Sequence, residues 1–308
     1  MSVLEAIGHT PLVELRRLPP PGAARVLVKL EFANPTGSMK DRMAVAAINA
    51  AEADGRLKPG GTVVEYTGGT TGVSLAFVCA AKGYRARIVF SDAVSQDKKL
   101  MMEALGAEVS LVRSGGGGIT EKVVRQMIEE ARALGGRPGH WWCDQLNNRD
   151  AIAGYVPLGE EILEQAERVD AFVHCVGTAH SIHGATRGLR KGGAKVHVVA
   201  VEPAESAVLA GGPGGSHGID GIGIGFVPPL WEPHEVNEMM TVSTSDAKAM
   251  ARRLAAEEGV FAGTSSGANV VAALRVAQRL GKDATVATIM VDSGLRYVST
   301  DVFLRPQH

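Results

Sequence analysis

Short runs rich in β-branched residues alternate with alanine-rich amphipathic runs along most of the 308-residue chain. The β-branched runs are continuously apolar, which is typical of strands that are buried on both faces of a parallel sheet. This alternation predicts an α/β protein with mainly parallel sheets flanked by helices. We expect strands at Val26–Leu30, Thr62–Glu65, Ala86–Phe90, Glu108–Val112, Ala171–Val176, Val196–Val201 and Thr285–Val291, and helices at about 39–54, 72–82, 96–105, 119–134, 150–166, 181–191, 245–257 and 266–280.

The stretch GGRPGHWWCDQLNNR, residues 135–149, is rich in turn formers and polar residues and precedes a predicted helix. It favours two sheets in two domains over one large sheet, although an ordinary long loop would have the same composition.

Charge and composition exclude several classes of protein. The formal net charge is −1 and the sequence pI is about 6.8, so no bulk field attracts nucleic acid or an anionic membrane. No apolar stretch reaches the ~20 residues that a membrane span requires, and the N-terminus lacks the basic region of a signal peptide. The three cysteines, Cys79, Cys143 and Cys175, lie in apolar surroundings without a CxxC motif, as buried reduced thiols do. We therefore expect a cytoplasmic protein with neither nucleic-acid nor membrane partners.

The segment NPTGSMKDR, residues 34–42, places Lys40 in the first turn of a predicted helix. The partial positive charge of a helix N-terminus disfavours a cation at this position. A partly desolvated lysine amine there spends time uncharged and can act as a nucleophile or a base. The alternative is a solvated lysine that pairs with Asp41, and the local sequence taken alone favours this alternative.

Two segments rich in glycine and threonine or serine each follow a predicted strand and precede a predicted helix: TGGTTG at 67–72 and GTAHSIHG at 177–184. Backbone N–H groups in such segments bind a carboxylate or a phosphate, although a structural turn could also explain TGGTTG. Cys175, His180 and His183 could suggest zinc, but Cys175 belongs to the predicted strand and a fourth ligand is missing. The second segment matches neither the Walker A motif nor GxGxxG.

A lysine amine, a carboxylate-binding segment and a phosphate-binding segment together suit pyridoxal 5′-phosphate (PLP) and an amino acid. The cofactor's aldehyde would react with the lysine, its phosphate would bind one segment, and the substrate carboxylate would bind the other. We therefore predict a PLP-dependent enzyme without a metal ion.

The motifs resemble those of the cysteine synthase group, which includes O-acetylserine sulfhydrylase and the catalytic core of cystathionine β-synthase. NPTGSMKDR is similar to the NPxxSxKDR lysine motif, and further similar segments follow nearly from end to end. They are IGHTPLVEL at 7–15, EYTGGTTGVSLAF at 65–77, CVGTAHSIHG at 175–184, DGIGIGFVPP at 220–229, EEGVFAGTSSGAN at 257–269 and DSGLRYVST at 292–300.

The resemblance implies the fold-type-II PLP-dependent fold, which is like the tryptophan synthase β subunit, with two open, mainly parallel sheets and the cofactor between the domains. It implies a smaller, mobile N-terminal α/β domain at 37–148 and a larger domain formed by 1–36 and 149–308. It also implies a homodimer and leaves a serine acetyltransferase partner undecided.

The resemblance also implies roles for single residues. Lys40 would be the Schiff-base lysine and the proton-transfer base. Ser265 would face the pyridine nitrogen, and a hydroxyl there leaves the ring unprotonated and favours β-elimination. The other residues implied are Thr70, Gly177, Thr178, Ala179, His180 and Ser181 for the cofactor, and Thr67, Gly68, Gly69, Thr71, Gln145 and Gly221 for the substrate.

Two of these segments depart from the family pattern. The family's Ser-Gly-Asn is Gly68-Gly69-Thr70 here, so the asparagine's contact with the cofactor ring hydroxyl is either made by Thr70 or lost. Glycine at 68 also removes a hydrogen-bond donor to the substrate. In the phosphate segment, Ala179-His180 replaces Gly-Gly, and the bulkier His180 must point outward or toward the substrate.

The activity that the resemblance implies is β-replacement on O-acetylserine or O-phosphoserine through an aminoacrylate intermediate. Sulfide would be the nucleophile and L-cysteine the product. The alternatives are a PLP-dependent serine or threonine dehydratase, and a PLP-holding but catalytically inactive binding subunit.

Overall fold

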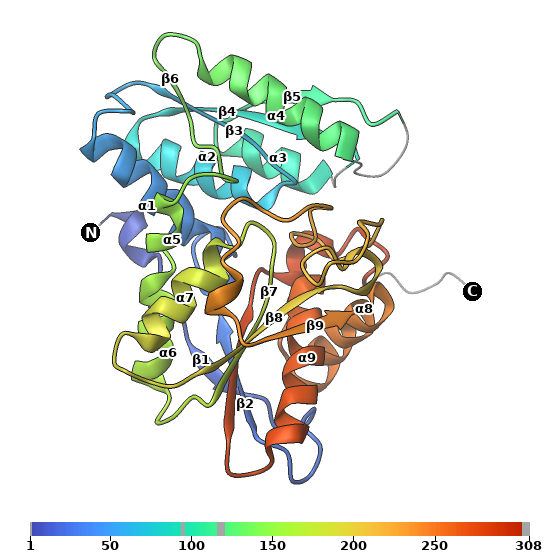
Figure 1. The fold of residues 1–308 in the computed structure, drawn as a ribbon. Helices are drawn as coiled ribbons and strands as arrows, with labels where there is room; N and C mark the ends of the chain where they lie inside the picture. The colour runs from blue at the N-terminus through green and yellow to red at the C-terminus, as the bar shows by residue number, and fades with distance from the viewer. Residues whose placement is uncertain (1, 94–95, 116–120, 304–308) are drawn as a thin grey trace. The chain divides into compact units, whose positions relative to one another are not determined.

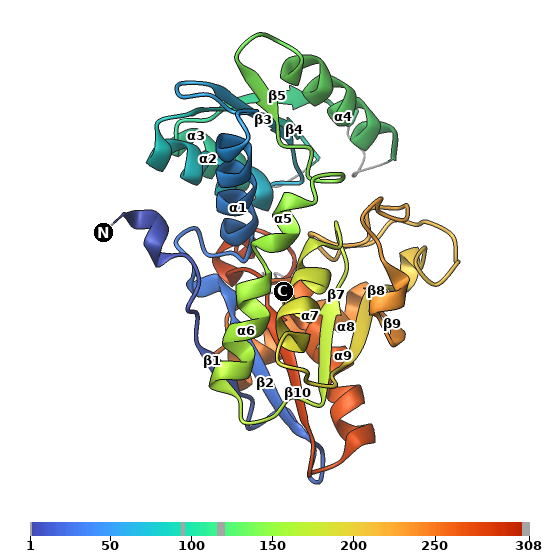
Figure 2. The same cartoon turned by 60° about the vertical axis from the view of Figure 1, so that its left-hand side comes forward.

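The computed structural model describes residues 2–93, 96–115 and 121–303 of an α/β chain (Figures 1 and 2). The chain divides into two compact units, one formed by Met1–Ile7 and Lys40–Gly154 and the other by Gly8–Met39 and Tyr155–His308. Each unit contains its own sheet, which confirms the prediction of two mainly parallel sheets flanked by helices. The predicted domain limits and the mobility of the smaller domain stay predictions.

The first unit is built on a four-stranded sheet with the order β5-β4-β3-β6, in which every neighbouring pair is parallel. Its helices α2 and α3 lie on one face and α4 lies on the other (Figures 1 and 2). Every residue of β3 is buried, as the continuous apolar run predicts. The strands are β3 (Thr62–Tyr66), β4 (Arg85–Ser91), β5 (Glu108–Val112) and β6 (His140–Trp142); the helices are η1 (Val3–Ala6), α1 (Lys40–Ala53), α2 (Thr70–Lys82), α3 (Gln96–Ala104), α4 (Glu121–Gly135) and α5 (Asp150–Ala153).

The second unit is built on a six-stranded sheet with the order β1-β2-β10-β7-β8-β9, in which only β1 runs antiparallel to its neighbour. Valines of its strands pack with the alanine-rich face of α9 to form the core. The strands are β1 (Leu12–Glu14), β2 (Arg25–Leu30), β7 (Ala171–Cys175), β8 (His197–Pro203), β9 (Glu238–Val242) and β10 (Thr285–Met290). The longer helices are α6 (Val156–Gln165), α7 (His180–Arg190), α8 (Thr244–Arg253) and α9 (Thr264–Leu280). The short helical segments are the 3-10 helices η2 (Glu31–Ala33), η3 (Ala204–Ser206), η4 (Pro233–Glu235) and η6 (Gly294–Tyr297) and the π-helix η5 (Leu254–Glu258).

The seven predicted strands are all present, with ends shifted by at most two residues, but β1, β6 and β9 were not predicted. The helix predicted over 150–166 is wrong as one element, because it is divided into α5 and α6. A Cβ on Gly154 would collide with the carbonyl of Arg42, so the chain passes close to α1 where the helix is interrupted. Residues 119–120 of another predicted helix lie outside the described residues. Among the helices that the structure describes, none is both long and apolar enough to cross a bilayer.

Candidate active site

In the first unit, the segment TGGTTG and Gln145 both follow the carboxyl ends of strands in the sheet. Strands β3 and β6 are parallel neighbours, with Thr62 opposite His140, so their carboxyl ends point the same way. Strand β3 leads into Thr67 and β6 leads toward Gln145. This edge of a parallel sheet is where α/β proteins bind ligands.

The glycine-rich segment forms the N-terminus of α2. The Oγ1 atom of Thr67 accepts hydrogen bonds from the N–H groups of Gly69, at 2.9 Å, and Gly72, at 3.3 Å, and thereby closes the turn. Gly69 is the N-cap residue with φ 125° and has no side chain of its own to cap the helix. The N–H groups of Thr70 and Thr71, at the start of α2, therefore have no intrahelical partner and suit an anion.

The glycines at 68 and 69 differ in the space around them. A Cβ on Gly69 would collide with the side chain of the buried Lys98, whereas a Cβ on the exposed Gly68 would meet nothing within 4 Å. Packing therefore requires glycine at 69 only, and the serine that the family carries at position 68 would fit here. Thr70, in place of the family's asparagine, is the first residue of α2.

Gln145 joins the ends of β3 and α2. Its Nε2 donates to the carbonyl of Tyr66 at 2.7 Å, and its Oε1 accepts from the Thr71 hydroxyl at 2.9 Å. The only hydroxyl hydrogen of Thr71 is therefore used within the protein. The amide nitrogen of Gln145 carries two hydrogens, so one remains available for a ligand.

A buried carboxyl group forms a hydrogen bond with the backbone of Gln145. Glu65, at the end of β3, is fully buried and accepts hydrogen bonds from the backbone N–H groups of Tyr66 and Gln145, both at 2.9 Å. Burial raises the pKa of Glu65 to about 8, although the two N–H bonds act in the opposite direction. Sequence reasoning missed this residue, and the available signal was an acidic residue inside a continuously apolar strand.

Lys40 is the first residue of α1 and is half-buried. Residues of the second unit hold the segment that ends at Met39. The N–H of Met39 donates to the carbonyl of Val291 at 3.0 Å, and the N–H of Ser293 donates to the carbonyl of Gly37 at 2.9 Å. The guanidinium of the buried Arg296 donates to the carbonyl of Thr36. The DSGLRYVST motif therefore fixes the backbone immediately before Lys40.

In the second unit, the predicted phosphate segment connects β7 to α7. Gly177 lies so close to the carbonyl of Gly221 that a Cβ would collide with it. Ala179 is the N-cap residue of α7, adopts the left-handed conformation with φ 69°, and caps no N–H with its side chain. The N–H groups of His180 and Ser181, at the start of α7, therefore have no intrahelical partner.

The three residues that could suggest zinc make contacts within the protein. Cys175 lies in β7, as predicted, and its Sγ donates to the carbonyl of Ser265 at 3.6 Å. His180 is 1% exposed and its Nδ1 lies 2.8 Å from Oγ1 of Thr178, so it does not point outward. His183 has its Nδ1 2.7 Å from a carboxylate oxygen of Glu235, and burial lowers its pKa despite this neighbour.

Ser265 lies at the start of α9 and is almost fully buried. The hydroxyl oxygens on either side of it hold two loops, because Thr264 accepts from the N–H of Asp220 at 3.0 Å and Ser266 accepts from the N–H of Val291 at 2.9 Å. These contacts fix the first turn of α9 and connect it to the segment that contains Gly221.

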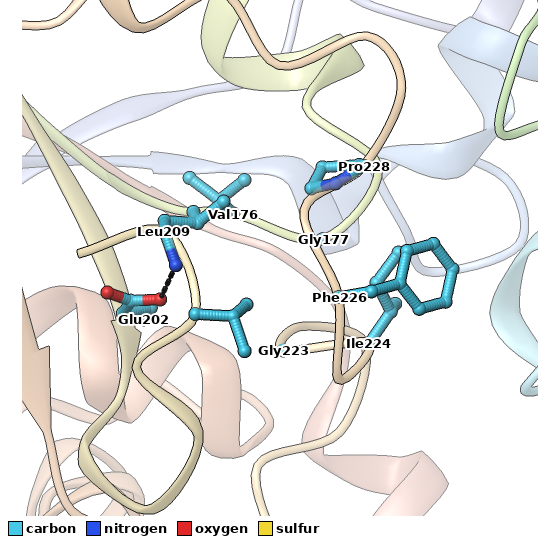
Figure 3. Close-up of a pocket in the computed structure, with 9 residues that line it drawn as sticks. Val176, Gly177, Glu202, Leu209, Gly223, Ile224, Phe226 and Pro228 are labelled. Carbon is cyan, nitrogen blue, oxygen red and sulfur yellow. Dashed lines mark hydrogen bonds between the residues drawn. The ribbon is translucent and has the colours of Figure 1, made fainter. Parts of the chain in front are cut away.

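A small pocket beside Gly177 is lined mainly by apolar side chains, with Val176, Ile224 and Phe226 among them (Figure 3). Glu202 also lines this pocket, and its carboxylate accepts from the N–H groups of Leu209 at 2.8 Å and Ala210 at 2.9 Å. Burial raises the pKa of Glu202 above its ordinary value. The glutamate thus fixes the loop that follows β8.

The residues present fit PLP in each part that the structure describes. The uncapped start of α7, flanked by the hydroxyls of Thr178 and Ser181, is a donor set that suits a phosphate. Close packing of the backbones of Gly177 and Gly221 shapes this segment. The uncapped start of α2 suits the carboxylate of an amino-acid substrate, and Lys40 supplies a primary amine.

Comparisons with known proteins agree with this chemistry. Residues 3–292 match the family described as pyridoxal-phosphate dependent enzyme. The chain is 39% identical over 305 residues to a cysteine synthase of Staphylococcus aureus, a match that covers 98% of this chain and 96% of the relative.

Solved structures give the same result. A cysteine synthase of Entamoeba histolytica superposes with a TM-score of 0.92 at 36% identity, covering 99% of this chain and 91% of that one. An O-ureido-L-serine synthase superposes with a TM-score of 0.91 at 36% identity, covering 100% and 95%. The chain belongs to the family of pyridoxal-phosphate dependent enzymes and is a PLP-dependent enzyme of the cysteine synthase type.

Proposed function

We propose that this chain catalyses PLP-dependent β-replacement on an activated L-serine, either O-acetylserine or O-phosphoserine, with sulfide as the nucleophile and L-cysteine as the product. One observation carries the proposal. After β7, the segment Gly177–Ser181 contains the N-cap and the first two residues of α7 and forms an uncapped helix N-terminus of the kind that binds a phosphate. It does so in a chain that belongs to a PLP-dependent family.

We assign attachment of the cofactor and proton transfer to Lys40. Because Lys40 begins α1, the positive end of the helix disfavours its ammonium form, and both tasks need an uncharged amine. When bound, PLP supplies the electron sink for the pair left at the substrate Cα. Lys40 would remove the Cα proton, the β-substituent would leave with its bonding electrons, the sulfur of HS⁻ would add at Cβ, and Lys40 would return the proton to Cα.

The start of α2 binds the substrate carboxylate in this proposal. Thr67 accepts two backbone N–H bonds, so its own hydroxyl hydrogen is free to point to a ligand. Gln145 contributes its remaining amide hydrogen. The other substrate contacts that we propose come from Gly68, Gly69, Thr71 and Gly221.

We propose the following residues as the cofactor contacts. Thr178, Ala179, His180 and Ser181 bind the phosphate together with Gly177. Ser265 faces the pyridine nitrogen, where a hydroxyl rather than a carboxylate leaves the ring unprotonated. Thr70 takes the place of the family's asparagine at the ring hydroxyl.

The test is spectroscopic and uses the purified holoenzyme. O-acetylserine or O-phosphoserine alone should change the absorption spectrum of the bound cofactor before any sulfide is added. Sulfide should then restore the original spectrum and release L-cysteine. No spectral change with either activated serine would contradict the proposal, and steady release of an oxo acid despite sulfide would identify a dehydratase instead.

We also propose that the enzyme is a cytoplasmic homodimer. Cys79, Cys143 and Cys175 are all buried and free, which suits a reducing compartment. Burial also raises the pKa of Cys79 to about 12, so this thiol stays protonated and unreactive. Sedimentation velocity of the holoenzyme should give a mass close to twice that of the chain, and a monomer at micromolar concentration would contradict the dimer.

A further inference from the structure

A buried histidine lies directly behind the segment that binds the phosphate in our proposal. His174 is in the middle of the fully buried strand β7, and its ring has no exposed surface. Its Nε2 lies 2.8 Å from Oγ of Ser181, and its Nδ1 lies 3.3 Å from Nδ2 of Asn269. The two ring nitrogens therefore face two different polar side chains.

The orientation of Asn269 is fixed by the backbone rather than by the histidine. Its Oδ1 accepts from the N–H of Cys175 at 2.7 Å, and its Nδ2 donates to the carbonyl of Ile289 at 2.7 Å. If the amide were rotated by half a turn, its NH₂ group would face the N–H of Cys175 and its oxygen would face the carbonyl oxygen of Ile289, and neither pair could form a hydrogen bond. The group that Asn269 presents to His174 is therefore an N–H donor.

This orientation determines the tautomer of His174. Because Nδ1 faces a donor, it must accept and cannot carry a hydrogen. The ring hydrogen of neutral His174 is then on Nε2, which donates to Oγ of Ser181. The Ser181 oxygen accepts from His174, so the hydroxyl's own hydrogen must point away from the histidine.

We propose that His174 is a positioning residue that presents the Ser181 hydroxyl as a hydrogen-bond donor to the phosphate of the cofactor. The inference rests on the proposed function, because it requires a phosphate at the start of α7. Ser181 is the second residue of that helix, where its hydroxyl and the neighbouring N–H groups can serve one anion. The backbone thus fixes the amide of Asn269, and this amide determines the tautomer of His174. His174 in turn orients the hydroxyl of Ser181, which binds the ligand.

The alternative is a histidine that only fills space in the core. The two roles predict different behaviour of the variants His174→Phe and Ser181→Ala. Phenylalanine also places an aromatic ring at position 174, but this ring donates no hydrogen bond to Ser181. Alanine at position 181 removes the hydroxyl on which His174 acts. If His174 acts through Ser181, His174→Phe should have no further effect in a protein that already carries Ser181→Ala. If the effect of His174→Phe is purely structural, it should add to the effect of Ser181→Ala.

The first measurement is the dissociation constant for PLP. PLP is removed from each holoenzyme, and the resulting apoenzyme is titrated with PLP. We expect His174→Phe to weaken binding about threefold to tenfold, as loss of one orienting hydrogen bond predicts. The double variant should bind PLP as Ser181→Ala does. His174→Gln, whose amide nitrogen can donate to Ser181, should recover part of the loss.

Two results would overturn the inference while leaving the proposed function intact: wild-type affinity in His174→Phe, or a further loss in the double variant beyond Ser181→Ala. Failure of the wild-type protein itself to bind PLP would overturn the proposed function as well. The second measurement is the ¹⁵N NMR spectrum of the labelled holoenzyme. It should show the hydrogen of His174 on Nε2, and a hydrogen on Nδ1 would refute the assignment.

Discussion

The hydroxyl of Thr71 donates to Oε1 of Gln145 across 2.9 Å, and this bond ties the first turn of α2 to the segment that follows β6. The same glutamine side chain donates to the carbonyl of Tyr66 at the end of β3. One buried amide therefore fixes the position of the N–H groups that we propose for the substrate carboxylate.

Gln145→Ala should impair both stability and substrate binding. The change leaves the Thr71 hydroxyl and the Tyr66 carbonyl without their partner, so the free energy of unfolding should fall by roughly 2 kcal/mol. The KM for the activated serine should rise about tenfold, equivalent to ~1.4 kcal/mol. Urea unfolding and initial rates measure the two effects. Asn147→Ala, at an exposed neighbour, is the control, and equal behaviour of both variants would contradict this role.

The two neighbouring glycines should respond in opposite ways to alanine. Gly69→Ala forces a side chain into a residue with φ 125° and against Lys98, and should cost roughly 1–3 kcal/mol of stability. Gly68→Ala meets open space and should change the unfolding free energy by less than about 0.5 kcal/mol. Thermal and urea unfolding of the pair decide the matter, and equal losses would show that the segment packs differently.

Gly68→Ser should improve substrate binding. The side chain has room, and its hydroxyl adds a donor near the site that we propose for the carboxylate. The KM for the activated serine should fall about twofold to tenfold, in line with one added hydrogen bond. Gly68→Ala provides the matched control without the hydroxyl. A KM that is the same in both variants would place the substrate away from residue 68.

Ala179→Gly should stabilise the protein. Alanine in the left-handed conformation is strained by roughly 1–2 kcal/mol, and glycine removes that strain. The gain in unfolding free energy should be about 1 kcal/mol, reduced by the greater freedom of glycine in the unfolded chain. Ala185→Gly, inside the same helix, is the control and should destabilise. Destabilisation by both changes would contradict the strain.

Glu65 should give the stability a dependence on pH. Its pKa in the folded state, about 8, lies above the ordinary 4.5, so the folded state binds the proton more tightly. Its stabilising contribution is complete below pH 4.5 and is lost as the pH rises through 8, with a slope of at most about 1.4 kcal/mol per pH unit. Urea unfolding across this range should show the slope in the wild type and not in Glu65→Gln. If the free energy of unfolding of Glu65→Gln changes with pH as steeply as that of the wild type, the pH dependence comes from another group.

Much of this architecture could be predicted because the relevant signals are local. Continuous apolar runs such as the one in β3 identified seven strands, although β9, with five residues, was not predicted, and glycine-rich segments after β3 and β7 indicated the starts of α2 and α7. Strands β1 and β6 have three residues each, and β6 exists because His140–Trp142 pairs with β3, a contact that no local pattern reveals. The interruption between α5 and α6 depends likewise on the close approach of Gly154 to α1.

The polar groups that support the site were harder to predict. Glu65 and His174 are single polar residues inside buried strands, and their function depends on which atoms face them after folding. One partner of His174 is Asn269, 95 residues away, and one partner of Glu65 is Gln145, 80 residues away. A sequence shows that such residues are unusual in a buried strand, but their partners follow only from the packing.

The most direct test of the central claim is the identity of the lysine that binds the cofactor. Treatment of the holoenzyme with borohydride fixes PLP on the lysine to which it is attached, and peptide mass spectrometry then locates it. We predict the label on the peptide that contains Lys40 and no label in Lys40→Ala. Lys98 is the informative alternative, because it is buried beside Gly69 in the carboxylate segment. A label on Lys98, or on any lysine other than Lys40, would contradict the account.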